Sequence, residues 1–388
     1  MPGGPGSQQA LRVQNAATVL AVLRRHGPQV QASLARSTGL SNATVSNIVR
    51  HLVDQGRVRT ERVLTGGRWS VLVSSAPDGR VVVGIDVGRT HLRVLGCDAA
   101  HRVFGLRHVE LDPDHDPDET LALASRTLDE VLADRDVPRD RVRACGMALP
   151  ASLSPTTGVV VQASVLPHWS GRDLAALATA VLGLPTVVDN DANLGALGHV
   201  VFGSQGAVGA LLYLKVASGI GAGMAFDGHL YRSTSGLAGE IGHAQVVEGG
   251  DVCYCGNRGC LETVSSTRRV VADFGHIRPG RAVGLADVLA AARAGEPAIR
   301  RILEEAGSAL GRVVAPVCNL LSPDVVVLGG PLTEVAGPLL DAMVVSVRQR
   351  ALPSAVAGTR FLLSELDGQA EVHGACALAL QHLPASGV

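Results

Sequence analysis

Hydrophobic positions in the first 75 residues recur at helical spacing in short segments. The first segment ends at the breaker formed by residues 26–28, and its apolar positions are Ala16, Val19, Leu20 and Leu23. A second helix is predicted over residues 31–37 and ends before Gly39, and Ser41 is placed to cap a third. Three short helices with a glycine-containing turn before the last are typical of a helix-turn-helix.

The third helix is predicted to have one apolar and one polar face. Its apolar residues fall at i, i+3, i+4, i+7 and i+8 and predict a buried stripe of Val45, Ile48, Val49, Leu52 and Val53. The residues expected to contact DNA are mostly short and polar and include one cation: Asn42, Ala43, Thr44, Ser46, Asn47 and Arg50. Such groups suit the base edges and phosphates of a major groove.

Two strand-like runs follow, at residues 57–63 and 69–73, and the segment between them holds two glycines and Arg68. A hairpin with a glycine tip is typical of a wing, from which Arg68 would reach a minor groove or a phosphate. Residues 1–73 also carry nine arginines against two acidic residues, although the net charge of the whole chain is −1. The basic charge favours DNA binding. A solvated helix face, or a three-helix domain that binds protein, remains the alternative.

Strands and helices alternate after a linker at residues 76–80, which is typical of an α/β domain. Residues 81–87 form an apolar run that enters a turn containing Asp86, Gly88 and Thr90. Side-chain oxygens and backbone N–H groups in such a turn can hold a metal-phosphate group. The same Asp-x-Gly-x-Thr pattern also closes ordinary hairpins.

The most apolar window, residues 208–226, is interrupted by Lys215 and four glycines. It therefore predicts a strand, a turn and a second strand instead of a membrane helix. The N-terminus shows no charged segment followed by an apolar run and a cleavage site, so no signal peptide is expected. Seven cysteines in such a chain indicate a cytoplasmic protein whose clustered thiols bind metal more readily than they form disulfides.

Polar residues gather at 187–193, where a predicted strand ends and a helix of small residues begins. A carboxylate beside a carboxamide at a strand end can bind sugar hydroxyls, and Asp191 could also take a proton as a general base. The alternative is helix capping by Asp191 or Asn193, which can coexist with ligand binding.

One histidine and three cysteines have the spacing of a metal site. Three thiolates and one imidazole complete a tetrahedral zinc shell with no open position, formed by His243, Cys253, Cys255 and Cys260. The zinc would be structural, and three unrelated buried thiols are the alternative. Glu240 and Glu262 bracket the cluster, so a metal would fix both carboxylates against one cavity, unless either is a surface charge.

These segments, in this order, resemble the ROK family of repressors and sugar kinases, and more narrowly its regulators with an N-terminal winged helix. The resemblance rests on Thr65-Gly66-Gly67-Arg68, Leu166-Pro167-x-Trp169, Asn190-Asp191-x-Asn193, Gly239-Glu240-Ile-Gly242-His243 and Cys253-x-Cys255-Gly-x-x-Gly259-Cys260-x-Glu262.

The resemblance implies an α/β fold with a winged helix-turn-helix over residues 1–75 and a two-lobed, actin-like ATPase domain over residues 81–388. Lobe 1 would comprise about 81–187 with a C-terminal helix at about 370–388, and lobe 2 would comprise about 188–369.

The resemblance also implies functional residues and partners. Zinc would be held by His243 and the three cysteines, and sugar would contact Asn190, Asp191, Glu240, His243 and Glu262. His243 would then use one ring nitrogen for the metal and one for the sugar. The implied partners are operator DNA, a small sugar or sugar phosphate, and further copies of the chain in a dimer or tetramer.

Three nucleotide-side elements depart from the kinase pattern. Arg89 stands where family kinases have a second glycine, residues 217–221 replace Gly-Thr-Gly-Ile-Gly, and residues 329–331 replace Gly-Gly-Gly. Val165 also stands where many kinases have asparagine, which puts the identity of the sugar in question.

These departures put ATP and Mg²⁺ binding in doubt. We therefore expect a sugar-responsive regulator, a repressor of carbohydrate genes, that is not an enzyme. An ATP-dependent sugar kinase with Asp191 as its base is one alternative. A regulator that takes its signal from a partner protein is the other.

Overall fold

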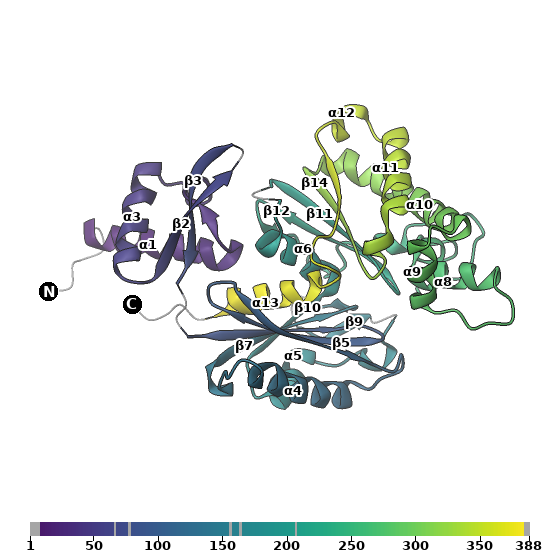
Figure 1. The fold of residues 1–388 in the computed structure, drawn as a ribbon, viewed down its shortest axis with the longest axis horizontal. Helices are drawn as coiled ribbons and strands as arrows, with labels where there is room; N and C mark the ends of the chain where they lie inside the picture. Colours follow the sequence, from purple (N-terminus) through teal and green to yellow (C-terminus); the bar gives the residue numbers. More distant parts are fainter. Residues whose placement is uncertain are drawn as a thin grey trace.

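The computed structural model describes residues 8–383 except 66, 77–78, 155–156, 163–164 and 206–207. A small N-terminal domain lies beside two larger lobes, which face each other across the C-terminal helix (Figure 1). Among the described residues, no helix is both long and apolar enough to span a membrane.

The N-terminal domain contains three helices and a small sheet. Its helices are α1 (Gln8–His26), α2 (Gln31–Thr38) and α3 (Asn42–Asp54), and its strands are β1 (Gln29–Val30), β2 (Val58–Thr65) and β3 (Arg68–Ser75). The strand order is β1-β3-β2, with antiparallel pairing throughout. Gly39 ends α2 in the left-handed conformation, and the Ser41 hydroxyl caps α3 by accepting from the Thr44 N–H at 3.1 Å. The predicted helix-turn-helix is confirmed.

Two details of this domain differ from expectation. Val53 is 39% exposed, because the core covers α3 only as far as Leu52 and the next residue turns about 100° away from it. The hairpin connection is also shorter than predicted, since Thr65 pairs directly with Arg68. Gly66 at its tip and Pro77 and Asp78 in the linker lie outside the described residues.

Lobe 1 is built on a five-stranded sheet with the order β10-β7-β4-β5-β6. Its strands are β4 (Val81–Val87), β5 (His91–Asp98), β6 (Val103–Glu110), β7 (Val142–Leu149) and β10 (Thr186–Asn190). Strands β10, β7 and β4 are parallel, whereas β5 and β6 are antiparallel additions. Helices α4 (Pro117–Ala133) and α5 (Leu174–Leu182) cover the outer face (Figure 1). Residues 188–190 continue β10, so this sheet extends three residues beyond the expected lobe boundary.

Lobe 2 repeats this topology with the order β13-β12-β11-β14-β15. Its strands are β11 (Ala210–Val216), β12 (Ile220–Phe226), β13 (His229–Leu230), β14 (Val325–Gly329) and β15 (Arg360–Leu363). The window at 208–226 therefore forms the predicted strand, turn and strand. Helices α10 (Pro297–Leu321) and α11 (Gly337–Arg350) pack on this lobe. Its shorter elements are α7 (Glu262–Ser265), α8 (Thr267–His276), α9 (Leu285–Arg293) and α12 (Pro353–Val356). Lobe 1 also holds a two-stranded sheet of β8 (Ser152–Leu153) and β9 (Val160–Gln162).

Two helices, α6 (Asp191–Phe202) and α13 (Ala370–His382), lie between the sheets and pack on each other (Figure 1). A Cβ atom at Gly198 would lie 2.2 Å from the Ala370 carbonyl oxygen, and one at Gly374 would lie 1.7 Å from that of Leu194. Glycine at both positions therefore lets the helix backbones touch, which fixes the axis about which the lobes meet.

Candidate functional site

A cavity of about 720 Å³ opens between the lobes and brings together residues from distant parts of the sequence. Its walls include the β4–β5 turn of lobe 1, the start of α6, the β11–β12 turn of lobe 2 and the segment around Glu240. All five expected sugar contacts line it: Asn190, Asp191, Glu240, His243 and Glu262. The residues that the sequence selected thus share one cleft.

Asn190 caps the N-terminus of α6. Its side-chain oxygen accepts from the Ala192 N–H at 2.9 Å, and its amide nitrogen donates to the Ala151 carbonyl at 3.2 Å. The N-cap residue is therefore Asn190, and the Asp191 carboxylate also accepts from the Ala192 N–H at 2.7 Å. The Asn193 side chain instead donates to Asp189. Asn190 is the cap because it is the last extended residue before the helix.

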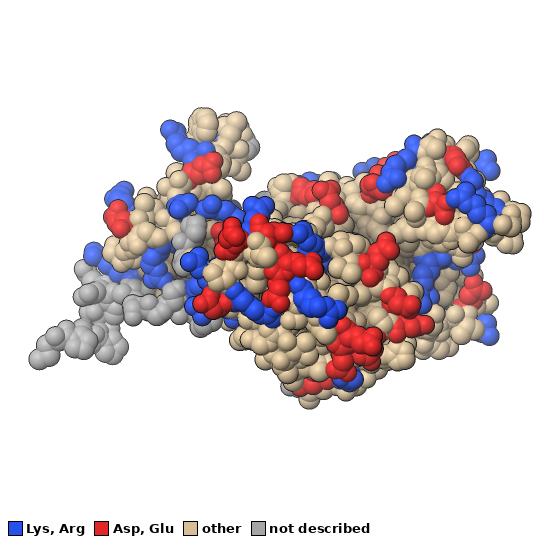
Figure 2. Space-filling model, turned by 60° about the horizontal axis from the view of Figure 1, so that its bottom comes forward, with Lys and Arg blue, Asp and Glu red and all other residues tan. Residues whose placement is uncertain are grey.

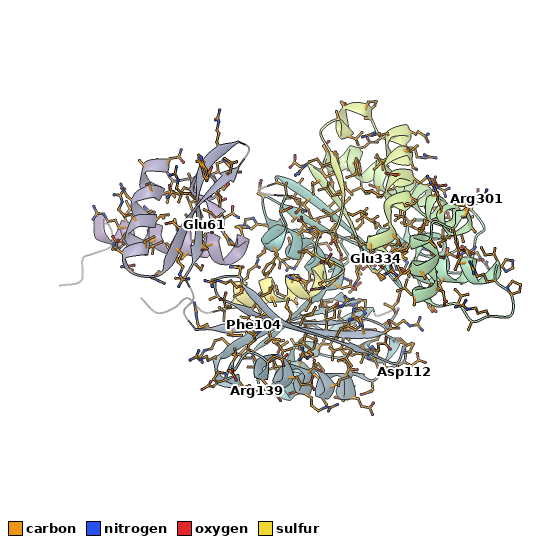
Figure 3. All side chains as sticks on the ribbon, in the orientation of Figure 1. Glu61, Phe104, Asp112, Arg139, Arg301 and Glu334 are labelled. Carbon is orange, nitrogen blue, oxygen red and sulfur yellow. The ribbon has the colours of Figure 1, made fainter. Side chains whose placement is uncertain are left out.

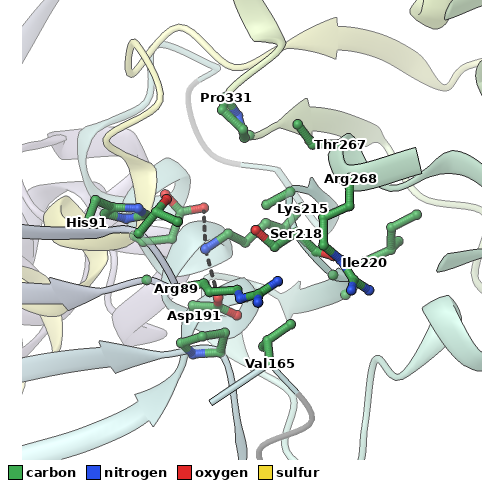
Figure 4. Close-up of a pocket in the computed structure, with 18 of the residues that line it drawn as sticks. Arg89, His91, Val165, Asp191, Lys215, Ser218, Ile220, Thr267, Arg268 and Pro331 are labelled. Carbon is green, nitrogen blue, oxygen red and sulfur yellow. Dashed lines mark hydrogen bonds and ion pairs between the residues drawn. The ribbon is translucent and has the colours of Figure 1, made fainter. Parts of the chain in front are cut away.

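Asp191 forms an ion pair with a residue to which sequence reasoning assigned no role. The Lys215 ammonium lies 2.7 Å from the Asp191 carboxylate and 3.6 Å from that of Glu371, and all three side chains are buried (Figure 4). Burial by itself lowers the pKa of Lys215, but the two carboxylates raise it well above its usual value. A lone lysine inside an apolar strand was the available signal, since Lys215 is the only lysine in the chain.

The predicted phosphate turn is occupied by the protein's own side chains. Asp86 is fully buried, and its carboxylate meets His91 Nε2 at 3.0 Å and the Arg93 guanidinium at 3.2 Å. Burial opposes ionisation, yet His91 and the nearby cations hold the pKa of Asp86 well below its usual range. The His91 ring also lies over Gly88, where a Cβ atom would be 2.1 Å from Cε1. The Gly88 N–H already donates to the His91 carbonyl at 2.9 Å.

Two side chains of the same turn remain available to a ligand. Thr90 is exposed at the edge of the cavity, and Arg89 extends into it (Figure 4). Within the described part of the chain, Arg89 has no hydrogen bond or ion pair. The β4–β5 turn therefore offers the Arg89 guanidinium to the cleft, whereas the buried Asp86 carboxylate of the same turn is already paired with His91 and Arg93.

The two glutamates both belong to lobe 2 and line the cavity. The Ser152 hydroxyl of lobe 1 donates to Glu240 of lobe 2 at 2.7 Å, which is a direct hydrogen bond across the cleft. Glu262 is buried, so it is no surface charge, and it accepts from the Ile220 N–H at 3.3 Å. Its other oxygen lies 3.7 Å from the Arg268 guanidinium. Contacts within the protein therefore orient both carboxylates.

The four expected metal ligands form one cluster beside this cavity. Their ligand atoms all lie within 4.8 Å of one another, in the set His243, Cys253, Cys255 and Cys260. Nδ1 of His243 faces the Cys253 sulfur at 3.5 Å, while Nε2 lies 3.8 Å from Glu240. Three thiols and one imidazole suit tetrahedral zinc, and Nε2 stays directed toward the cavity side.

The N-terminal domain presents a second surface. Asn42, Ala43, Asn47 and Arg50 are exposed on α3, whereas Thr44 and Ser46 are half-buried. Arg68 is exposed at the hairpin tip, and Arg62 lies over the Trp69 ring at 5.4 Å. Basic side chains are spread over this domain, at the left of Figure 2, and acidic ones gather on the neighbouring lobes. Glu61, one of its two acidic residues, lies on β2 (Figure 3).

Comparison with known proteins places these features in a family. A family model described as the ROK family matches residues 82–382. The chain belongs to the ROK family. A model of the MarR family matches residues 13–68, which span most of the N-terminal domain. This ROK protein therefore combines the family's α/β domain with a helix-turn-helix.

Relatives match along nearly the whole chain. The xylose repressor of Caldicellulosiruptor bescii is 26% identical over 398 residues, covering 97% of this chain and 98% of the relative. The transcriptional dual regulator NagC of Escherichia coli is 27% identical over 411 residues, covering 98% and 99%.

Solved structures show the same fold. A ROK family transcriptional regulator described as a homolog of the E. coli MLC protein has a TM-score of 0.71 at 24% identity, covering 96% of this chain and 97% of that one. A ROK family glucokinase from Streptomyces griseus, in complex with glucose and AMPPNP, has a TM-score of 0.69 at 24% identity. It covers 78% of this chain and 99% of its own, so the likeness stops at the two lobes.

Proposed function

We propose that the protein is a cytoplasmic, sugar-responsive transcriptional repressor that binds operator DNA through α3 and the β2–β3 hairpin. Relatives named xylose repressor and N-acetylglucosamine repressor match almost the full chain, including the DNA-binding domain. A small sugar would bind in the cleft through Asn190, Asp191 and Glu240, with His243 and Glu262 completing the site. Two copies would read two half-sites of an operator.

The proposal rests on a difference between the sugar side and the nucleotide side of the cleft. Asp191 is ion-paired with Lys215, so it is not free to take a proton from a sugar hydroxyl. Asp86 is engaged by His91 and Arg93 in the turn where a metal-nucleotide would bind. The sugar side keeps oriented donors and acceptors that face open space. A ligand can therefore be bound, but the groups that would phosphorylate it are occupied.

Arg89 extends the proposal to phosphorylated sugars. Its guanidinium reaches into the cavity on the nucleotide side and has no partner among the described residues. A guanidinium is suited to bidentate contact with a phosphate. The effector would then be either a neutral sugar or a sugar phosphate whose phosphate lies against Arg89.

Zinc would have a structural role in this protein. The cluster of three thiols and one imidazole fits the metal, and it joins the segment of Glu240 and His243 to that of Glu262. The bound metal would hold those segments at a fixed separation, and the protein's own carboxylates would contact the sugar.

The test starts with a thermal-shift screen of sugars and sugar phosphates on the purified full chain. DNA that the protein selects from a random-sequence library then serves for affinity measurements with and without each hit. A sugar that changes operator affinity supports the proposal, and equal affinity across the panel overturns it. A coupled assay for ADP release tests the kinase alternative. Sugar-dependent turnover that is lost in Asp191→Asn would establish that alternative instead.

A further inference from the structure

The end of α1 contacts both lobes at the back of the cleft. The Gln381 amide of α13 donates to the Arg25 carbonyl at 3.2 Å, and the Arg25 guanidinium donates to His229 Nε2 of β13 at 2.7 Å. Helix α13 packs on the sheet of lobe 1, whereas β13 belongs to the sheet of lobe 2. One residue of the DNA-binding domain is thus held from both sides of the hinge.

The hydrogen bonds of His229 determine which of its ring nitrogens accepts from Arg25. Nδ1 of His229 lies 2.9 Å from the Asp227 carbonyl, so Nδ1 carries the proton and Nε2 accepts from Arg25. The His26 ring packs edge-on against His229 with centroids 5.2 Å apart. Burial, with His229 and Arg25 nearby, lowers the pKa of His26 to about 4, which leaves its ring neutral near pH 7.

Backbones approach closely at the same place. A Cβ atom at Gly27 would lie 2.8 Å from the Val201 carbonyl oxygen, and one at Gly228 would lie 2.5 Å from His26 Nδ1. Both glycines also have positive φ, at 69° and 75°. The end of α1 therefore packs closely on α6 and on the turn between β12 and β13.

Helix α6 runs from the proposed sugar site to this contact. It begins at Asp191, which is ion-paired with Lys215 of the lobe 2 sheet, and its last turn contains Val201 beside Gly27. Twelve helical residues span about 18 Å, and a helix of that length moves as a rigid body. A rotation of lobe 2 about the cleft would therefore displace Val201 and His229 together.

We propose that Arg25 and His229 form a latch between the DNA-binding domain and lobe 2, and that closure of the cleft around a sugar opens this latch. The inference rests on the proposed function and names how that site is regulated. Gln381 ties the end of α1 to α13, which packs on lobe 1, so Arg25 does not follow lobe 2 when the lobes rotate. Breaking the latch frees the domain and changes the separation of two recognition helices in a dimer.

The experiment uses the full chain and the variant His229→Ala, whose side chain is exposed. His276→Ala, another exposed histidine of lobe 2, is the matched control. Calorimetry measures sugar affinity, and fluorescence anisotropy measures operator affinity with and without sugar. Hydrogen exchange monitors peptides covering residues 22–30 and 226–231. We expect sugar to speed exchange in both peptides of the wild type.

In His229→Ala, we expect sugar affinity within about twofold of the wild-type value and a sugar effect on operator affinity reduced at least fivefold. His276→Ala should behave as wild type. A sugar that binds without changing exchange in either peptide, or a full response in His229→Ala, overturns the latch and leaves the proposed function intact. If no sugar binds, the proposed function fails. The latch is then judged from ligand-free operator affinity, where equal values for wild type and His229→Ala reject it.

Discussion

The ammonium group of Lys215 lies 2.7 Å from the carboxylate of Asp191, and this pair joins the start of α6 to the central strand of the lobe 2 sheet. Glu371 of α13 completes the arrangement at 3.6 Å from the same ammonium. One buried cation therefore links the first turns of α6 and of α13 to the same strand of lobe 2. Asp191, which the kinase alternative would need as a base, is ion-paired in this structure.

Replacing Lys215 with methionine should destabilise the protein strongly. The change leaves two buried carboxylates without their cation, and removing one partner of a buried ion pair costs about 3–5 kcal/mol. Urea unfolding followed by circular dichroism would show the lower midpoint. Arg172→Met is the control, because Arg172 pairs with Asp118 on the surface and should change the midpoint little. A Lys215→Met midpoint equal to that of the control would contradict this role.

Arg89→Gly should separate the two classes of effector. It restores the glycine of the kinase pattern and removes the unpaired guanidinium, so a sugar phosphate that contacts Arg89 should bind about tenfold to 100-fold more weakly. Neutral sugars should bind as before and provide the internal control. Calorimetry with each sugar and its phosphate gives both numbers. Equal losses for the two classes would mean that Arg89 supports the shape of the cavity and not the phosphate.

Removal of zinc should loosen the sugar site before it affects DNA contacts. The cluster fixes the segments that carry Glu240 and Glu262, so apoprotein made by chelation, or Cys255→Ser, should lose sugar binding and melt at a lower temperature. A loss of about 2 kcal/mol corresponds to roughly 3 °C for a domain of about 300 residues. Elemental analysis should find one zinc per chain in the native protein. Recovery with Zn²⁺ but not Mg²⁺ is the control, and a metal-free native protein that binds sugar would refute the prediction.

Trp69, in the β2–β3 hairpin, can report DNA binding through its fluorescence. Trp69 is 65% exposed beside Arg62, whereas Trp169, the other tryptophan, is fully buried in lobe 1. Operator binding should therefore change the tryptophan emission, and Trp69→Phe should abolish that change. Arg68→Ala should weaken binding and lower its salt dependence by about one phosphate contact. If emission still responds to DNA in Trp69→Phe, the hairpin does not account for the signal.

Several features could be predicted because they depend on neighbours in the sequence. Helix periodicity located α3, and Ser41 and Gly39 marked ends that are set within one turn of helix. The spacing of the cysteines was enough to predict that these side chains cluster as a metal site would require, since the three thiols lie within eight residues of one another and only His243 is more distant. Asn190 was predicted to contact sugar, but helix capping was assigned to Asp191 or Asn193. The sequence pattern does not locate the boundary between a strand and a helix to within one residue.

Only the tertiary structure decided how these parts act. Lys215 lies 24 residues from Asp191, Arg25 lies 204 residues from His229, and Gln381 lies 356 residues from Arg25. The Lys215–Asp191 pair is buried because two sheets pack against α6 and α13, which removes water and makes pairing decisive for buried charges. The two contacts of Arg25 are exposed and exist because the N-terminal domain lies against α13 and β13. By itself the sequence predicted the helix-turn-helix, the four residues of a cluster that could hold a metal, and a set of residues that line the inter-lobe cavity. Packing determined that the carboxylates of Asp191 and Asp86 are ion-paired within the protein, and that the end of α1 contacts both α13 and β13.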